Sequence, residues 1–143
     1  MAYEFEAFLA ENVEKAKTEE YVVTDRIKDS EGNPIPWTLR PIDAGLDARI
    51  RKASMVSLPI PGKKGMRERQ MDTNTYMCKL AVASILKPDL NNVQLQGSYG
   101  CMDPEDLLRK MLTAGEIQNL YLKVEEINGF DHDLDEAVEE AKN

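Results

Sequence analysis

Apolar side chains recur at intervals of three and four residues in five stretches of the chain, a spacing that places them on one face of a helix. The five helices predicted from this spacing cover residues 3–17, 43–56, 72–87, 103–112 and 113–127. The last helix carries a continuous stripe that consists of Ile117, Leu120, Tyr121, Val124 and Ile127. Helices should therefore make up most of the regular structure.

Residues that favour helix ends support these boundaries. Asp43 is a suitable cap for the second helix, because an Asp side chain there accepts a hydrogen bond from the first turn. Asp103 precedes Pro104, and proline is favoured at the first position of a helix. Thr113 and Glu116 have the spacing of a capping box, in which each side chain bonds the backbone of the other residue. The sequence thus predicts a break between the last two helices.

Alternating apolar residues replace the helical spacing early in the chain. Residues 21–28 and 35–40 are predicted to be strands, and residues 29–34, DSEGNP, consist of turn formers. We therefore predict a β-hairpin. Since an isolated hairpin is marginal in water, the face that carries Trp37 should pack on a helix or on another chain. The unpaired edges of the hairpin are candidate sites for self-association into a homo-oligomer.

Two stretches lack any periodic spacing. Residues 57–65 contain two prolines and two glycines, and we predict a loop there. Residues 88–101 hold Gly97 and Gly100 and are predicted to be an ordered connector with at most one short turn.

The 143 residues fit one domain, because domains run to roughly 100–200 residues. The predicted fold class is mainly α with a small N-terminal β-hairpin (α+β), in a compact helical domain. We divide this domain into an N-terminal helix and β-hairpin (1–42), a helical region (43–129) and an acidic tail that frays (130–143).

The chain carries 18 basic and 26 acidic residues, a formal net charge of −8. Binding to a nucleic acid duplex needs clustered Lys and Arg, so nucleic acid is not an expected partner. No run approaches the roughly 18 apolar residues that span a membrane, and the acidic start lacks the features of a secretory signal. Cys78 and Cys101 are interpreted as small apolar side chains, because two cysteines do not make a disulfide framework. We expect a cytoplasmic protein with no membrane partner.

Basic residues are concentrated in the middle of the chain, where residues 43–69 hold seven of them against three acidic ones. Lys63, Lys64 and Arg67 are candidates for contact with an acidic partner, or with the acidic tail of this chain, by electrostatic attraction. The alternative is a solvated loop whose charges only keep the protein soluble. The run GKKG at 62–65 lacks the spacing of a phosphate-binding loop.

Candidate metal-binding and catalytic residues are confined to the tail. Asp131, Asp133 and Asp135 alternate as at the start of a calcium-binding loop, but Glu136 stands where that loop needs glycine. His132, the single histidine, lies among these carboxylates, and we interpret it as a surface residue. No catalytic residue, metal or cofactor is predicted.

The amphipathic helices carry more apolar surface than one small core is expected to absorb, and surfaces rich in methionine adapt to varied partners. The residues that we assign to a partner-binding groove are Leu107, Leu108, Met111, Leu112, Ile117, Leu120 and Tyr121. The alternative at each position is packing in the core. The residues alone thus predict an acidic, mainly helical interaction protein without a visible active site.

A series of short phrases runs in a fixed order along nearly the whole chain. They are FLAEN at 8–12, YVVTDRI at 21–27, EGNP at 31–34, WTLRPI at 37–42, Tyr76 with Lys79 and Leu80, PDLN at 88–91, LQ at 95–96, SYG at 98–100, PEDLL at 104–108, KML at 110–112, GE at 115–116 and INGFD at 127–131. Together these phrases resemble the XkdN-like tail assembly chaperones of long-tailed phages and defective prophages. No single phrase is diagnostic, and their shared order carries the resemblance.

The resemblance implies a non-enzymatic assembly factor that is made in the host cytoplasm and is absent from the mature virion. Proteins of this family are thought to bind the tape measure protein, keep it soluble and help to recruit tail tube subunits around it. In many such phages a programmed frameshift adds a domain that contacts the tube protein. The implied partners are therefore the tape measure protein and, through a frameshifted longer form, the tail tube protein.

Two other functions are compatible with the residues. A small non-enzymatic adaptor or regulatory protein would bind one protein partner at one-to-one stoichiometry, whereas a chaperone would bind a tape measure protein in many copies. A calcium protein or minor enzyme would use residues 131–135, and calcium would then raise its melting temperature.

Overall fold

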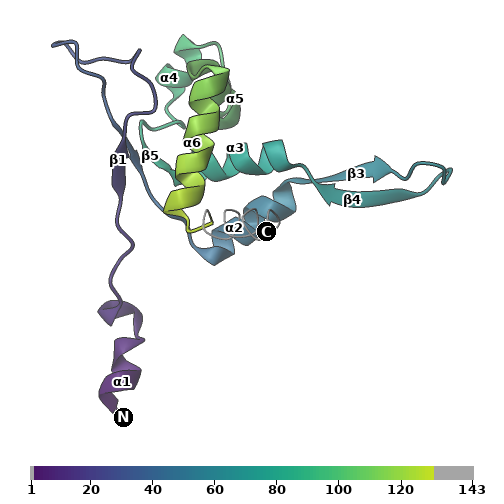
Figure 1. Ribbon diagram of the computed structural model, residues 1–143, viewed down its shortest axis with the longest axis horizontal. Helices are drawn as coiled ribbons and strands as arrows, with labels where there is room; N and C mark the ends of the chain where they lie inside the picture. The colour runs from purple at the N-terminus through teal and green to yellow at the C-terminus, as the bar shows by residue number, and fades with distance from the viewer. Residues whose placement is uncertain (1, 131–143) are drawn as a thin grey trace, which may run out of the picture.

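Helix α3 (Thr73–Ser84) lies at the centre of the molecule, and three other helices pack against it. The computed structural model describes residues 2–130 of the chain. Helices α2 (Ala44–Ala53), α5 (Pro104–Met111) and α6 (Ala114–Ile127) all contact α3 (Figure 1). We call the part of the molecule that is built on these four helices the body.

The core takes large apolar side chains from all four helices, from residues 37–39 and from Ile85. Those with no exposed surface are Leu39, Leu80, Leu107, Leu108, Leu120 and Val124. Trp37 is only 2% exposed, so its ring packs on the core as predicted for the apolar face of its strand. Cys78 and Cys101 are buried free thiols, in agreement with their interpretation as small apolar side chains.

The predicted helix starts are confirmed. Asp43 accepts a hydrogen bond from the backbone N–H of Leu46 at 2.7 Å and caps α2. Asp103 caps α5, with Pro104 at the first helical position. Thr113 and Glu116 form both bonds of the capping box, which separates α5 from α6. Short polar side chains at these positions therefore set the helix boundaries, since they pair the N–H groups that a helix start leaves free.

The predicted N-terminal hairpin differs in its extent and its neighbours. Strand β1 (Glu19–Tyr21) pairs antiparallel with β2 (Trp37–Leu39), and β2 pairs on its other side with β5 (Ile85–Lys87). The first strand was predicted to cover residues 21–28, but the observed strand ends at Tyr21. Most of the chain between β1 and β2 forms a long loop, because Val23 turns into the core and Thr24 bonds α6. A helix was predicted over residues 72–87, but its last three residues form the strand β5.

The predicted N-terminal helix over residues 3–17 is wrong in its length. The structure has the short helix α1 (Ala2–Ala7) and a single 3-10 turn (Ala10–Asn12). Every side chain from Glu4 to Glu20 is exposed. An amphipathic stripe needs a surface to pack on, because isolated helices shorter than about 12 residues are marginal in water, and here the body provides none.

The predicted loop over residues 57–65 is wrong in part. Strands β3 (Met55–Pro59) and β4 (Arg67–Met71) form a five-pair antiparallel ladder that extends from the body between α2 and α3. Only the tip between these strands is a loop. Proline at the end of β3 and two glycines with positive φ, Gly62 (77°) and Gly65 (80°), fit a tight turn, so the turn residues join two strands instead of ending regular structure.

The connector over residues 88–101, for which at most one short turn was predicted, contains the six-residue helix α4 (Val93–Ser98). The described chain therefore combines helices with two small sheets, and the α+β class is confirmed. The predictions for Asp131, His132, Asp133 and Asp135 concern residues that lie outside the described part of the chain.

Candidate protein-binding site

An apolar pocket of about 310 Å³ opens between the loop that precedes β2 and the short helix α4. Its lining is formed by Ile27, Ile35, Pro36, Trp37, Lys87, Pro88, Leu95, Tyr99 and Met111. Eight of these nine side chains are apolar or aromatic, and Lys87 supplies the one charge. Pockets of this size and composition accept apolar side chains of a ligand or of another protein. We call this site the apolar pocket.

One wall of the apolar pocket is a tight loop that its own residues hold in place. The backbone N–H of Ile35 donates to the carbonyl of Ile27 at 3.0 Å and closes the loop. At its tip the Asp29 carboxylate accepts from the backbone N–H groups of Glu31 and Asn33, each at 2.9 Å. The turn formers found in the sequence therefore shape a wall of the pocket, and Ile27 and Ile35 face it from opposite ends of the turn.

A polar cluster fixes this loop to the start of α6. The Arg26 guanidinium contacts Glu116 at 2.5 Å and donates to the carbonyl of Met111 at 2.9 Å. The hydroxyl of Thr24 donates to the same Glu116 carboxylate at 2.6 Å. The pKa of Glu116 falls to about 2, because its carboxylate accepts hydrogen bonds from Arg26, from the backbone of Thr113 and from Thr24. Glu116 thus both caps α6 and anchors the pocket wall.

The opposite wall is α4, which is held by short-range bonds. Asn92 caps it by accepting from the backbone N–H of Leu95 at 2.9 Å, and Gln96 donates to the carbonyl of Leu90 at 2.8 Å. Tyr99, at the end of α4, is 38% exposed, so part of its ring reaches solvent at the pocket mouth. The helix is short, and these caps keep its apolar side toward the pocket.

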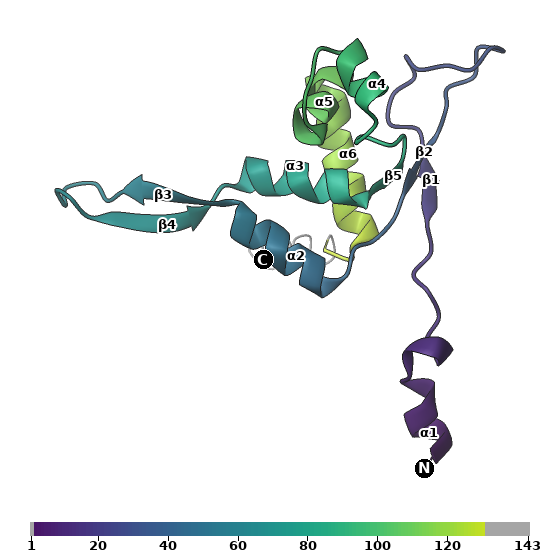
Figure 2. The same ribbon diagram turned by 180° about the vertical axis from the view of Figure 1, so that it is seen from behind.

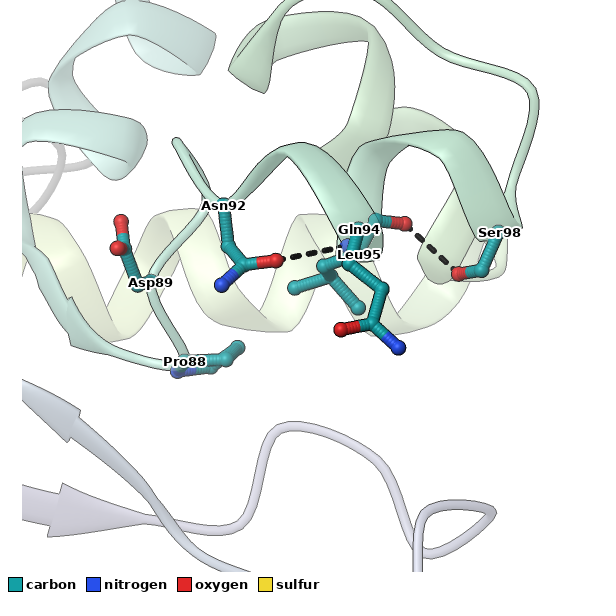
Figure 3. A pocket seen from close by; sticks show the side chains of 6 residues that line it. All are labelled: Pro88, Asp89, Asn92, Gln94, Leu95 and Ser98. Carbon is teal, nitrogen blue, oxygen red and sulfur yellow. Dashed lines mark hydrogen bonds between the residues drawn. The ribbon is translucent and has the colours of Figure 1, made fainter.

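A second hollow of about 430 Å³ adjoins the apolar pocket and shares Pro88 and Leu95 with it. Figure 3 shows Asp89, Asn92, Gln94 and Ser98 around Leu95, with the side-chain oxygen of Asn92 directed at the backbone of α4. The rest of its lining is polar. An apolar floor with polar groups along one side is the arrangement that a docked amphipathic helix requires.

The structure places most of the predicted groove residues inside the core. Their exposed fractions are 0% for Leu107, Leu108 and Leu120, 5% for Met111 and 7% for Leu112. These five side chains therefore form no open groove, because α5 and α6 turn their apolar stripes toward α3. Met111 nevertheless lines the apolar pocket. Ile117 and Tyr121 are half-buried beside the core.

The predicted basic contacts lie together on the β3–β4 extension. Lys63, Lys64 and Arg67 are all exposed at its tip or along β4. Arg67 is used within the extension, since its guanidinium donates to the hydroxyl and to the carbonyl of Ser57 at 2.9 and 2.8 Å. Lys63 and Lys64 have no side-chain partner within residues 2–130.

The pocket residues Ile27, Ile35, Leu95 and Tyr99 were not predicted from the sequence as a site. A signal existed for two of them, because Ile27 and Ile35 flank the turn-forming run at 29–34. Leu95 and Tyr99 lie in a stretch without apolar periodicity, and only the folded chain brings them to the loop. The site joins segments about 60 residues apart, which local spacing does not reveal.

Lys87 is the one charged side chain among the residues that line the apolar pocket. Among residues 2–130 no three His, Cys, Asp or Glu side chains are grouped in a way that would hold a metal ion. In the same range no helix has the length and apolar character needed to cross a membrane.

Comparison with known proteins identifies the class to which this chain belongs. Residues 5–142 match the family model of the phage XkdN-like tail assembly chaperone protein, and the chain is a member of this family. It is similar to the phage-like element PBSX protein XkdN of Bacillus subtilis (strain 168), with 29% identity over 142 residues that cover 99% of this chain and 95% of that protein.

A second relative supports the same fold. The uncharacterized protein YqbN of Bacillus subtilis (strain 168) is 28% identical over 99% of this chain and 94% of its own length. The crystal structure of the protein YqbN superposes with a TM-score of 0.71 at 23% identity and covers 87% of this chain and 94% of that chain. Most of this chain therefore shares its fold with an experimentally determined structure.

Proposed function

We propose that this protein binds the tape measure protein of its phage or prophage element and keeps it soluble until the tail tube forms around it. A tape measure protein before assembly exposes long apolar helical stripes, and such surfaces aggregate in water. Membership of the tail assembly chaperone family supports this proposal. The apolar pocket and its adjoining hollow supply the contact, with one face of a partner helix placed over Leu95 and Tyr99.

The proposal assigns binding to a small pocket and not to a large interface. A contact that fills about 310 Å³ with one or two side chains is weak by itself. Many copies along a repeating partner supply avidity, and each copy leaves easily when tube subunits arrive. Recruitment of tail tube subunits, action without catalysis, location in the host cytoplasm and absence from the finished virion all belong to this proposal.

Co-expression with the tape measure protein of the same element tests the proposal. We expect the wild-type chain to bring the tape measure protein into the soluble fraction as a complex that contains many copies of the chain. Tyr99→Ser should reduce the soluble fraction severalfold, because it removes the exposed ring at the pocket mouth. The readouts are the amount of soluble tape measure protein and the mass of the complex by light scattering.

Val93→Ser is the matched control, since Val93 begins the same helix and is 81% exposed but does not line the pocket. It should behave as the wild type. An equal loss with both variants, or a tape measure protein that stays insoluble with the wild type, would refute binding through the pocket. A complex with one copy of each protein would favour the adaptor function instead.

A further inference from the structure

Two segments of the chain project from the body without packing on it. The first is the N-terminal arm, which we define as residues 2–14. It leaves the body in a different direction from β3 and β4 (Figures 1 and 2). Within the described chain no hydrogen bond or ion pair links residues 4–14 to the body; the bonds of this stretch, such as Asn12 to the carbonyl of Glu6 at 2.8 Å, are internal. Phe5 and Phe8 are 68% and 77% exposed. The arm therefore presents aromatic rings to which this copy offers no surface.

The second extension is the β-arm, residues 55–71, made of β3, β4 and their turn. Its root is fixed, because the backbone N–H of Asp72 donates to the carbonyl of Ser54 at 2.8 Å and the Ser54 hydroxyl donates to Ile50 at 2.7 Å. Farther out, Leu58 is 41% and Met66 53% exposed. Both strands are exposed along most of their length. Because a two-stranded hairpin without a packed face is marginal in water, the β-arm also needs a covering surface.

The two arms carry opposite charge. Residues 4–14 contain four glutamates, Glu4, Glu6, Glu11 and Glu14, and no lysine or arginine. Residues 55–71 contain four basic side chains against the single acidic Glu68. Three of the basic ones, Lys63, Lys64 and Arg69, make no ion pair within the described chain. Each arm thus combines exposed apolar side chains with charges that the other arm complements.

We propose that the N-terminal arm of one copy binds the β-arm of a second copy. The contact pairs two different surfaces, so it is heterologous. After one contact, one copy still has a free β-arm and the other still has a free N-terminal arm. Repeated from copy to copy, such contacts build rings or open chains of copies. The aromatic rings of the N-terminal arm cover the apolar side chains of the β-arm, while glutamates lie against its lysines. This inference needs no tape measure protein and stands apart from the proposed function.

A charge-exchange experiment on the full chain tests this contact. One variant carries Glu4→Lys, Glu6→Lys and Glu11→Lys, and the other carries Lys63→Glu, Lys64→Glu and Arg69→Glu. Arg67 is left unchanged, because it braces the β-arm through Ser57. The mass distribution of each protein is followed by analytical ultracentrifugation over a range of concentration and salt.

The wild type should form species larger than dimers as concentration rises, and these should dissociate as salt screens the charges. Either variant alone should assemble at least about tenfold more weakly than the wild type, because like charges now face one another. An equal mixture of the two should recover the wild-type distribution, because every N-terminal arm then meets an oppositely charged β-arm. Circular dichroism checks that both variants are folded.

The matched control combines Glu31→Lys with Lys110→Glu, two exposed positions outside both arms, and it should assemble as the wild type does. Phe5→Ser with Phe8→Ser should abolish assembly without any change of charge. A wild type that is monomeric throughout, variants that assemble normally, or a mixture that fails to recover assembly would each overturn the proposal.

Discussion

The helical body and the two arms use apolar side chains in opposite ways. In the body, α3, α5 and α6 bury their apolar stripes against one another, and Leu80, Leu107 and Leu120 have no exposed surface. In the arms, Phe8 and Met66 are more than half exposed. Folding of the body therefore buries the apolar stripes of the helices that the sequence predicts most clearly. The apolar surface that stays exposed in the arms lies in short elements, of which only the N-terminal arm carries a helical apolar spacing.

The apolar pocket stands between these extremes. Trp37 and Met111 form its floor as part of the core, while Tyr99 and Pro36 reach solvent. The pocket is thus a place where the body is incompletely closed, and its walls are rigid because Glu116 and Asp29 hold them by hydrogen bonds. Because the pocket is already formed, little conformational entropy is lost in ordering its walls when a partner binds.

The largest effect in this comparison should come from Trp37. Trp37→Ala is expected to lower the free energy of unfolding by about 3–5 kcal/mol, because it leaves a cavity between β2 and the core. Urea unfolding followed by circular dichroism measures this change. A loss below about 0.5 kcal/mol, the range usual for surface substitutions, would show that the ring is not part of the core.

The capping box should contribute less. Thr113→Ala is expected to lower the free energy of unfolding by about 1 kcal/mol, since the backbone N–H of Glu116 loses its partner. Thr73→Ala is a suitable control, because Thr73 is an exposed residue in the first turn of α3 and its side chain caps nothing. Equal effects of the two substitutions would contradict a specific role for the box.

Acid should weaken the anchor between the loop and α6. The folded-state pKa of Glu116, about 2, lies below its ordinary value of 4.5. Its stabilising contribution is therefore fully present above about pH 4.5 and is lost as the pH falls toward 2. We expect Glu116→Gln to lose less stability than the wild type between pH 5 and 2, as measured by urea unfolding at each pH. A parallel pH profile for the two proteins would argue against the Arg26–Glu116 pair.

The smallest effects should come from the arms. Phe8→Ala and Lys64→Ala are each expected to change the free energy of unfolding by no more than about 0.5 kcal/mol, because neither side chain packs on the body. The measurement is made in dilute solution and high salt, where contacts between copies are weakest. A loss of several kcal/mol at either position would mean that the arms are part of the cooperative fold.

Local signals predicted the body well because they act within one element. Asp43, Asp103 and Thr113 bond N–H groups three residues away, and the apolar stripes of α5 and α6 follow from helical geometry alone. The fold class and the buried Trp37 followed from the same rules.

The features that the sequence did not predict depend on contacts between segments that lie far apart in the chain. Residues 85–87 continue the apolar run of α3 but pair with β2 instead, and residues 3–17 have a helical stripe with nothing to pack on. The groove residues Leu107 and Leu108 were assigned to a partner because the sequence shows how much apolar surface a helix has and not which neighbour covers it. The apolar pocket depends on contacts between residues 27–37 and 88–99, and no local pattern reports them.

Hydrogen–deuterium exchange of the chain, alone and bound to the co-expressed tape measure protein, tests most directly whether partners use the surface that folding leaves open. The account predicts that backbone amides in residues 27–37 and 88–99 exchange more slowly in the complex. Amides of α3 and α6 should be protected to the same degree in both states, because the body is already folded. Slower exchange only in α5 and α6, or opening of α3 on binding, would contradict the account.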